Sequence, residues 1–188
     1  LAKSGTIEHP YLKPQASGKK AVIVVTSNRG LAGGYNASVI KLITGSDLKP
    51  DDLLLYTVGN KGKEYFQHRE YTIAKDYSEV IENPMFSDAK EICEEVLGGY
   101  AAGEISEIYL AYTYFKNTVV HEPKLLKLLP VEIEEADIEA AKADSLMNYE
   151  PEETEALEII IPKYVTSILY GALVESIASE NGARMQAM

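Results

Sequence analysis

The residues with the clearest potential for chemistry lie in a glycine-rich segment, 26–36, between an apolar run and an amphipathic run. Glycines at such a junction let backbone amides approach phosphate, so the segment could bind a nucleotide. A dinucleotide loop has the spacing G-x-G-x-x-G, whereas the order from Gly30 to Gly34 is G-x-x-G-G. A P-loop needs Gly-Lys followed by Ser or Thr, but Gly62-Lys63 precedes Glu64. The sequence therefore favours a structural turn that brings a strand and a helix together.

The other reactive side chains do not form a recognisable site. His9, His68 and His121 are far apart in the sequence and lack the spacing of zinc ligands. Cys93 is the only cysteine, which excludes an intramolecular disulfide and a cysteine-rich metal cage and fits a reducing compartment. We interpret Cys93 as a small core residue on an amphipathic helix. No catalytic residue, metal or cofactor is therefore predicted.

Acidic residues dominate the charge of the chain, whose formal net charge is −11 over 188 residues. Binding to a nucleic acid backbone needs clustered Lys and Arg, so this class of function is excluded. Carboxylates are densest in segment 131–148, which offers little apolar wall for a pocket and is interpreted as a solvated loop or edge segment. No apolar run approaches the roughly 18 to 20 residues of a membrane span.

The elements that must position the glycine turn alternate between strands and helices. Apolar, β-branched runs of this kind suit strands that are covered on both faces. Strands are predicted over 21–26, 53–58, 72–74, 107–115 and 119–129. Helices are predicted over 36–43, 60–67 and 87–98, the last with Ser87 as its N-cap. Alternation of this kind favours an α/β fold, Rossmann-like, with a mostly parallel sheet and flanking helices.

The C-terminal segment is predicted to form one long helix. Its apolar residues recur at helical spacing through 165–177 and then thin out. Pro162 is expected to kink or restart this helix, because proline removes a backbone donor and crowds the preceding turn. Over 152–188 the helix would span roughly 55 Å, more than the α/β domain is expected to cover. Since no cap signal ends it at Met188 and the chain opens at Leu1, we interpret the sequence as the middle of a longer protein.

Five segments, in order along the chain, resemble the gamma subunit of the F-type ATP synthase. They are His9-Pro10-Tyr11, the turn 27–34 (SNRGLAGG), 59–62 (GNKG), 149–151 (YEP) and 172–188 (ALVESIASENGARMQAM). The last of these is highly specific. The chain departs from the family's usual pattern at three positions: Asn28, usually Asp; Ala32, often Cys; and Gly182, commonly Ala. The cysteine pair of the chloroplast redox-regulated type is absent, since Cys93 stands alone.

The resemblance implies a rotor shaft. In that family, N-terminal and C-terminal helices form an antiparallel coiled coil inside a ring of alpha and beta subunits. The α/β domain lies outside the ring, near the epsilon subunit and the membrane c-ring. Carried over by position, Glu180 and Arg184 fall where the shaft contacts the beta subunits, and Tyr149 and Glu150 fall at the foot, on the c-ring and epsilon side. The implied division is a lead-in over 1–17 after a missing N-terminal helix, an α/β domain over 18–148 and a truncated shaft helix over 149–188.

The implied function is to couple ion flow through the membrane sector to ATP synthesis or hydrolysis on the alpha and beta subunits, with no cofactor and no active site on this chain. The implied location is peripheral, on the cytoplasmic face of a bacterial plasma membrane. The alternative, drawn from the residues alone, is a small phosphate- or nucleotide-binding α/β enzyme that uses the turn from Gly30 to Gly34.

Two further expectations concern the end of the last helix. Arg184 lies where the apolar stripe has thinned, so it is expected to be a surface charge that adds little to the core. Beyond about Ile177 the helix is expected to lack a packing partner within this chain and to be weakly protected from exchange.

Overall fold

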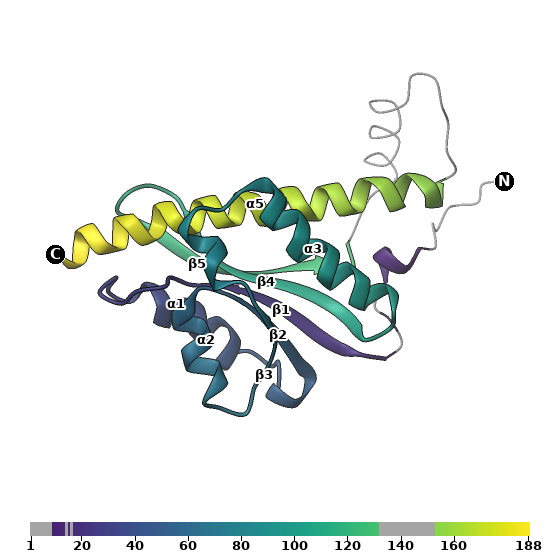
Figure 1. Cartoon of the computed structure of the whole chain (residues 1–188), viewed down its shortest axis with the longest axis horizontal. Coiled ribbons are helices and arrows are strands. Elements are labelled where there is room, and N and C mark those ends of the chain that lie inside the picture. The colour runs from purple at the N-terminus through teal and green to yellow at the C-terminus, as the bar shows by residue number, and fades with distance from the viewer. Residues whose placement is uncertain (1–8, 14, 16, 132–152) are drawn as a thin grey trace, which may run out of the picture.

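A five-stranded sheet forms the centre of the molecule (Figure 1). The computed structural model describes residues 9–13, 15, 17–131 and 153–188. The strands are β1 (Lys19–Val25), β2 (Leu53–Val58), β3 (Thr72–Asp76), β4 (Ile105–Phe115) and β5 (His121–Leu129), in the order β3-β2-β1-β4-β5. Strands β1, β2, β3 and β4 pair in parallel, and β5 joins β4 antiparallel. The predicted mostly parallel α/β fold is therefore confirmed.

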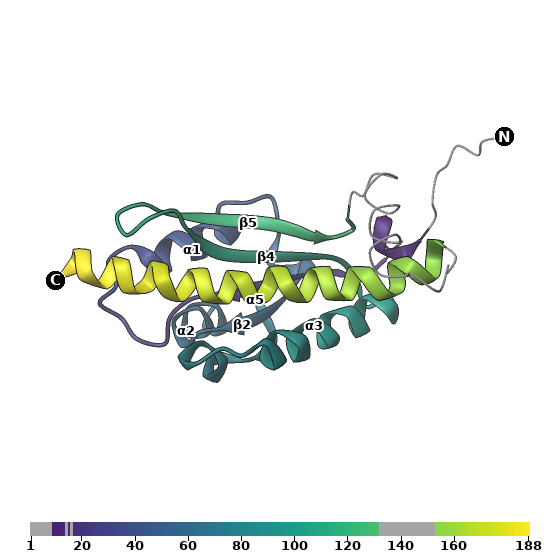
Figure 2. The same ribbon diagram turned by 90° about the horizontal axis from the view of Figure 1, so that it is seen from above.

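Helices cover both faces of this sheet. Helices α3 (Phe86–Ala101) and α5 (Glu153–Ala187) lie on one face, and α1 (Tyr35–Thr44) and α2 (Asn60–Gln67) lie on the other (Figures 1 and 2). Three short 3-10 helices complete the described elements: η1 (Pro10–Leu12), η2 (Pro50–Asp52) and η3 (Ser78–Glu82). Helix α3 begins at Phe86 after a Met85 N-cap, so the predicted N-cap at Ser87 is wrong by two residues.

Strand β1 explains why its sequence is apolar at successive positions. Side chains alternate between the two faces of a strand. Ile23 belongs to the core under α3 and α5, whereas Val22 and Val24 belong to the core under α1 and α2. Each of these three side chains is fully buried. Because both faces need apolar side chains, the period-two alternation of a half-exposed strand is lost.

Helix α5 runs without interruption from Glu153 through Pro162 to Ala187, so of the two outcomes predicted at Pro162, a kink or a restart, the restart is excluded. A stripe of fully buried side chains packs it against the sheet and α3 at Leu157, Ile161, Val165, Leu169 and Leu173. This packing on both sides of Pro162 compensates for the backbone hydrogen bond that proline cannot make.

The packing of α5 also continues past the point where the sequence suggested that it would stop. Ser179 and Gly182 are buried, so the expectation of an unpartnered helix beyond Ile177 is wrong for the described residues. By length and composition alone, the stretch Glu155–Ala187 would be able to cross a membrane, so the expectation that no apolar run approaches the length of a span is wrong by that measure. The same test is passed by core helices of globular domains, and α5 packs as one.

Candidate partner-contact site at the carboxyl end of the sheet

The glycine turn after β1 is held by bonds within the chain. The Ser27 backbone N–H donates to Asn36 Oδ1 at 2.9 Å, and Asn36 Nδ2 donates back to Ser27 Oγ at 2.9 Å. Ser27 Oγ donates to the Arg29 carbonyl oxygen at 2.7 Å. These contacts tie the turn to the first turn of α1, as expected for a structural connection between strand and helix.

Arg184 joins the end of α5 to the same turn. Its Nη1 donates to the Gly30 carbonyl oxygen at 2.5 Å, and its Nη2 donates to the Arg29 carbonyl oxygen at 3.0 Å. Glu180, one helical turn earlier, accepts from Arg184 Nε at 2.9 Å and from Nη2 at 2.7 Å. The two side chains are only 20% and 16% exposed. Arg184 is therefore a bonded, largely buried group, and its interpretation as a surface charge is wrong.

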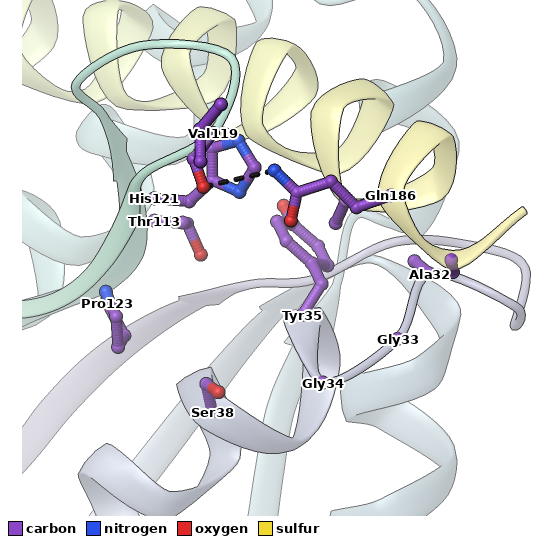
Figure 3. Close-up of a pocket in the computed structure, with 12 residues that line it drawn as sticks. Ala32, Gly33, Gly34, Tyr35, Ser38, Thr113, Val119, His121, Pro123 and Gln186 are labelled. Carbon is purple, nitrogen blue, oxygen red and sulfur yellow. Dashed lines mark hydrogen bonds between the residues drawn. The ribbon is translucent and has the colours of Figure 1, made fainter.

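Gln186 links the hairpin between β4 and β5 to the end of α5 by hydrogen bonds. Its Nε2 donates to the carbonyl oxygens of Thr118 and Val119, each at 3.0 Å, in the hairpin between β4 and β5. Figure 3 shows the bond to Val119. Deeper in the fold, Tyr35 Oη donates to the Ser176 carbonyl oxygen at 3.0 Å. Burial raises the pKa of Tyr35 far above its usual value, so its hydroxyl remains a donor at any physiological pH. The end of α5 is thus tied to α1 and to both loops.

A cavity of about 390 Å³ lies between the glycine turn, α1, the hairpin and the last turns of α5 (Figure 3). It is lined by Ala32, Gly33, Gly34, Tyr35, Ser38, Thr113, Val119, His121, Pro123, Ala183, Gln186 and Ala187. This lining contains no lysine, arginine or carboxylate to balance a phosphate charge or to pair in acid–base catalysis. Among the described residues, no group of three or more His, Cys, Asp and Glu side chains could hold a metal ion.

The hydrogen bonds of Asn28 explain why this position holds asparagine, where the family that the sequence resembles usually has aspartate. Its Nδ2 donates to the Ser78 carbonyl oxygen at 3.1 Å and to Glu82 Oε1 at 2.7 Å. Its Oδ1 accepts from the Asn60 backbone N–H at 2.8 Å. An aspartate would keep only the acceptor role and would place a second carboxylate beside Glu82.

Replacing Asn28 with aspartate should therefore destabilise the chain by about 1–2 kcal/mol, because two donated bonds are lost and like charges meet. Urea denaturation with a constant m-value would measure the change. The control is Glu82→Gln in the Asn28→Asp background, which supplies a donor to the new carboxylate and should recover most of the loss. Equal midpoints for the wild type and Asn28→Asp would contradict the prediction.

Gly182 is the second position at which the chain departs from the family's usual pattern, and the neighbouring His121 explains this departure. A Cβ atom at position 182 would lie 2.5 Å from His121 Nε2 and 3.0 Å from the Thr118 carbonyl oxygen. His121 Nε2 itself lies 3.0 Å from that carbonyl oxygen. The glycine therefore makes room for the histidine that begins β5.

We expect Gly182→Ala to destabilise the wild type by about 1 kcal/mol or more, because His121 and the hairpin must move. In a His121→Ala background the main clash is removed, and the same change should become neutral or stabilising by up to about 1 kcal/mol, the helix preference for alanine over glycine. Thermal denaturation of the four proteins tests the change of sign. If Gly182→Ala changes the stability with the same sign in both backgrounds, the argument that Gly182 makes room for His121 is refuted.

The predicted contact residues are only partly described by the structure. Glu180 and Arg184 lie together at the end of α5, as their spacing of four on a helix predicts. Tyr149 and Glu150 lie outside the described residues, as does the acidic segment after position 131. Gln186 was not predicted, although it lies in the segment that carries the strongest resemblance. Its two acceptors are backbone carbonyls, which leave no mark in a sequence.

These features define a class of protein: an α/β domain that packs one long helix against its sheet from Leu157 onward and bonds the end of that helix to two loops. A family model described as ATP synthase matches residues 1–188. The chain is 58% identical over 194 residues to the ATP synthase gamma chain of Lachnoclostridium phytofermentans, covering 100% of this chain and 67% of that protein. It is 38% identical over 204 residues to the sodium ion specific ATP synthase gamma chain of Acetobacterium woodii, covering 100% of this chain and 68% of that protein.

Solved structures agree with the sequence comparisons. The central stalk and c-ring of the Tetrahymena thermophila mitochondrial ATP synthase contains a similar chain, with a TM-score of 0.64, 25% identity, and coverage of 93% of this chain and 77% of that one. A chain of the Euglena gracilis mitochondrial ATP synthase rotor shares the fold, with a TM-score of 0.62, 17% identity, and coverage of 90% of this chain and 65% of that one. The chain belongs to the family of ATP synthase gamma chains.

Proposed function

We propose that this chain is part of the central-stalk rotor of an F-type ATP synthase, and that it couples ion flow through the membrane sector to ATP synthesis or hydrolysis elsewhere in the complex. The observation that carries the proposal is α5, a helix of 35 residues that is packed along the sheet and fastened at its end by Arg184 and Gln186. A shaft must not slip against the domain that turns with it. A buried stripe along the helix together with bonds at its end meets this requirement.

The partners of the proposed rotor are the alpha and beta subunits, the epsilon subunit and the c-ring. Ile159, Tyr164 and Val174 on α5 are exposed apolar side chains. The coiled coil with an N-terminal helix remains a prediction from the family resemblance. The contacts of Glu180 and Arg184 with the beta subunits, and of Tyr149 and Glu150 at the foot, remain predictions. So does the division into a lead-in over 1–17, an α/β domain over 18–148 and a shaft helix over 149–188.

The proposed subunit is not itself catalytic. An asymmetric shaft presents a different face to each catalytic site of the ring as it turns, and so biases each site toward a different conformation. The complex is membrane-associated, and we place this chain peripherally on the cytoplasmic face of a bacterial plasma membrane. The relatives include a sodium-specific enzyme, and the driving ion of this complex is left open.

The alternative of a small phosphate- or nucleotide-binding enzyme is not supported. The cavity beside the Gly30–Gly34 turn has no lysine, arginine or carboxylate in its lining. The family assignment points to a different function.

Reconstitution tests the proposal. A synthase complex assembled with the full-length protein should pump ions when it hydrolyses ATP, and a complex assembled without it should not. Calorimetric titration of this chain with ATP and with ADP should show no stoichiometric micromolar site. Pumping that is independent of the chain would refute the rotor role, and a micromolar nucleotide site would revive the enzyme alternative.

A further inference from the structure

The turn held by Arg184 presents a leucine in a strained conformation. Leu31 has a φ of 65°, in the left-handed region that residues other than glycine rarely adopt. Its side chain is 90% exposed, so the conformation gains no burial within the described chain. Strain of this kind persists only where the surrounding contacts impose it, and it is concentrated at functional sites.

The contacts that impose it precede Leu31 directly. Arg184 holds the carbonyl oxygens of Arg29 and Gly30, the two residues before the leucine. On the other side, Ala32 is 2% exposed and anchors the chain in the fold. Leu31 is therefore held at the surface between two residues whose carbonyl oxygens bond to Arg184 and a buried alanine.

The donors of Arg184 are nearly all in use. A guanidinium has five N–H groups, and the four bonds to Glu180, Arg29 and Gly30 engage four of them. The charge is balanced by Glu180 at 2.7 Å. A group in this state is poorly suited to pair with a carboxylate on another subunit, because it would first have to give up its bonds within the chain.

We infer that Arg184, oriented by Glu180, is a positioning residue that acts on the catalytic ring through Leu31, and does not act by a direct ion pair with a beta subunit. The inference rests on the proposed rotor function and sharpens its predicted contact. The group presented to the partner is an apolar knob, the exposed side chain of Leu31. Arg184 and Glu180 set the orientation of the Leu31 side chain.

The first test concerns the isolated chain. In Arg184→Ala, NMR should show that Leu31 loses its positive φ, and the amide of Tyr35, which bonds to the Ala32 carbonyl oxygen at 3.2 Å, should exchange at least about tenfold faster. Arg184→Lys should behave in the same way, because one ammonium group cannot span two carbonyls and Glu180. Lys90→Ala, which removes one positive charge from the exposed face of α3, is the matched control and should change neither signal. An unchanged Leu31 conformation in Arg184→Ala would overturn the inference.

The second test is a double-mutant cycle in the reconstituted complex, measured as ions pumped per ATP hydrolysed. Leu31→Asn removes the apolar knob but keeps a residue that tolerates positive φ. Arg184→Ala and Leu31→Asn should each lower the ratio, and the double variant should be no worse than the poorer single variant. Additive losses would show that Arg184 acts by a contact of its own, and an unchanged ratio in both single variants would show that the turn does not act on the ring. Either result overturns the inference and leaves the rotor role standing, whereas a wild-type complex that cannot pump would count against the proposed function itself.

Discussion

Replacing Gly59 with alanine should destabilise the chain by about 3 kcal/mol or more, the largest effect that we expect from a single methyl group here. Gly59 follows β2 with a φ of 125°, a conformation that side chains rarely allow. An added Cβ would overlap the Thr26 carbonyl oxygen and would lie 2.6 Å from Thr26 Oγ1. Both atoms are fixed, because Thr26 Oγ1 donates to the Gly59 carbonyl oxygen at 3.2 Å and accepts from the Gly62 N–H at 2.9 Å. The ends of β1 and β2 would have to separate.

Urea denaturation would measure this loss, and Gly98→Ala is its matched control. Gly98 lies within α3, and a Cβ there would meet no atom within 4 Å. The control should therefore be stabilised by up to about 1 kcal/mol, because alanine favours a helix over glycine. A Gly59→Ala protein within about 0.5 kcal/mol of the wild type would refute the argument from close approach.

Truncation of Leu169 to alanine should cost about 2–5 kcal/mol, since a fully buried leucine leaves a cavity that the core only partly fills. Leu169 is 0% exposed in the core between α5 and the sheet. The same helix offers a control in Val174, which is 47% exposed and whose change to alanine should cost about 0.5 kcal/mol or less.

Hydrogen exchange distinguishes a loosened shaft from a weaker domain in the Leu169→Ala protein. Amides of α5 should exchange faster at denaturant concentrations where β1 is still protected, because the truncation weakens the face that joins helix to sheet. Equal acceleration in α5 and β1 would mean that the helix and the sheet open only together. If Leu169→Ala costs as little stability as Val174→Ala, Leu169 does not hold α5 to the sheet.

Most of the architecture was predictable because it depends on local patterns. The run at 21–26 predicted β1, and the run at 53–58 coincides with β2, since a strand covered on both faces needs apolar residues at successive positions. The prediction for α3 ended at Gly98, but the helix continues to Ala101. Tertiary packing decides this end: a Cβ on Gly99 would lie 2.6 Å from Ile105 Cδ1, so the glycine lets the helix approach β4.

The site was predictable only in outline. The resemblance identified Arg184 and Glu180 as important, and their spacing predicted their contact with each other. The turn that Arg184 holds lies 154 residues away in the sequence, and the groups it binds are backbone carbonyls that any residue carries. For the same reason, the hydrogen bonds of Gln186 to the hairpin were not predictable from the sequence. The pattern showed a charge on a helix, and only the fold shows what that charge binds.

The length over which α5 is attached has a mechanical consequence. From Leu157 to Gln186 the helix is held to the domain at intervals of about one turn, over roughly 45 Å at 1.5 Å per residue. A twist applied to this stretch is shared among many small contacts, and no single joint carries it. The docked stretch is therefore the rigid section of the shaft. Elastic deformation during rotation should be concentrated in helical sections that have fewer neighbours, where turning the helix axis disrupts less packing.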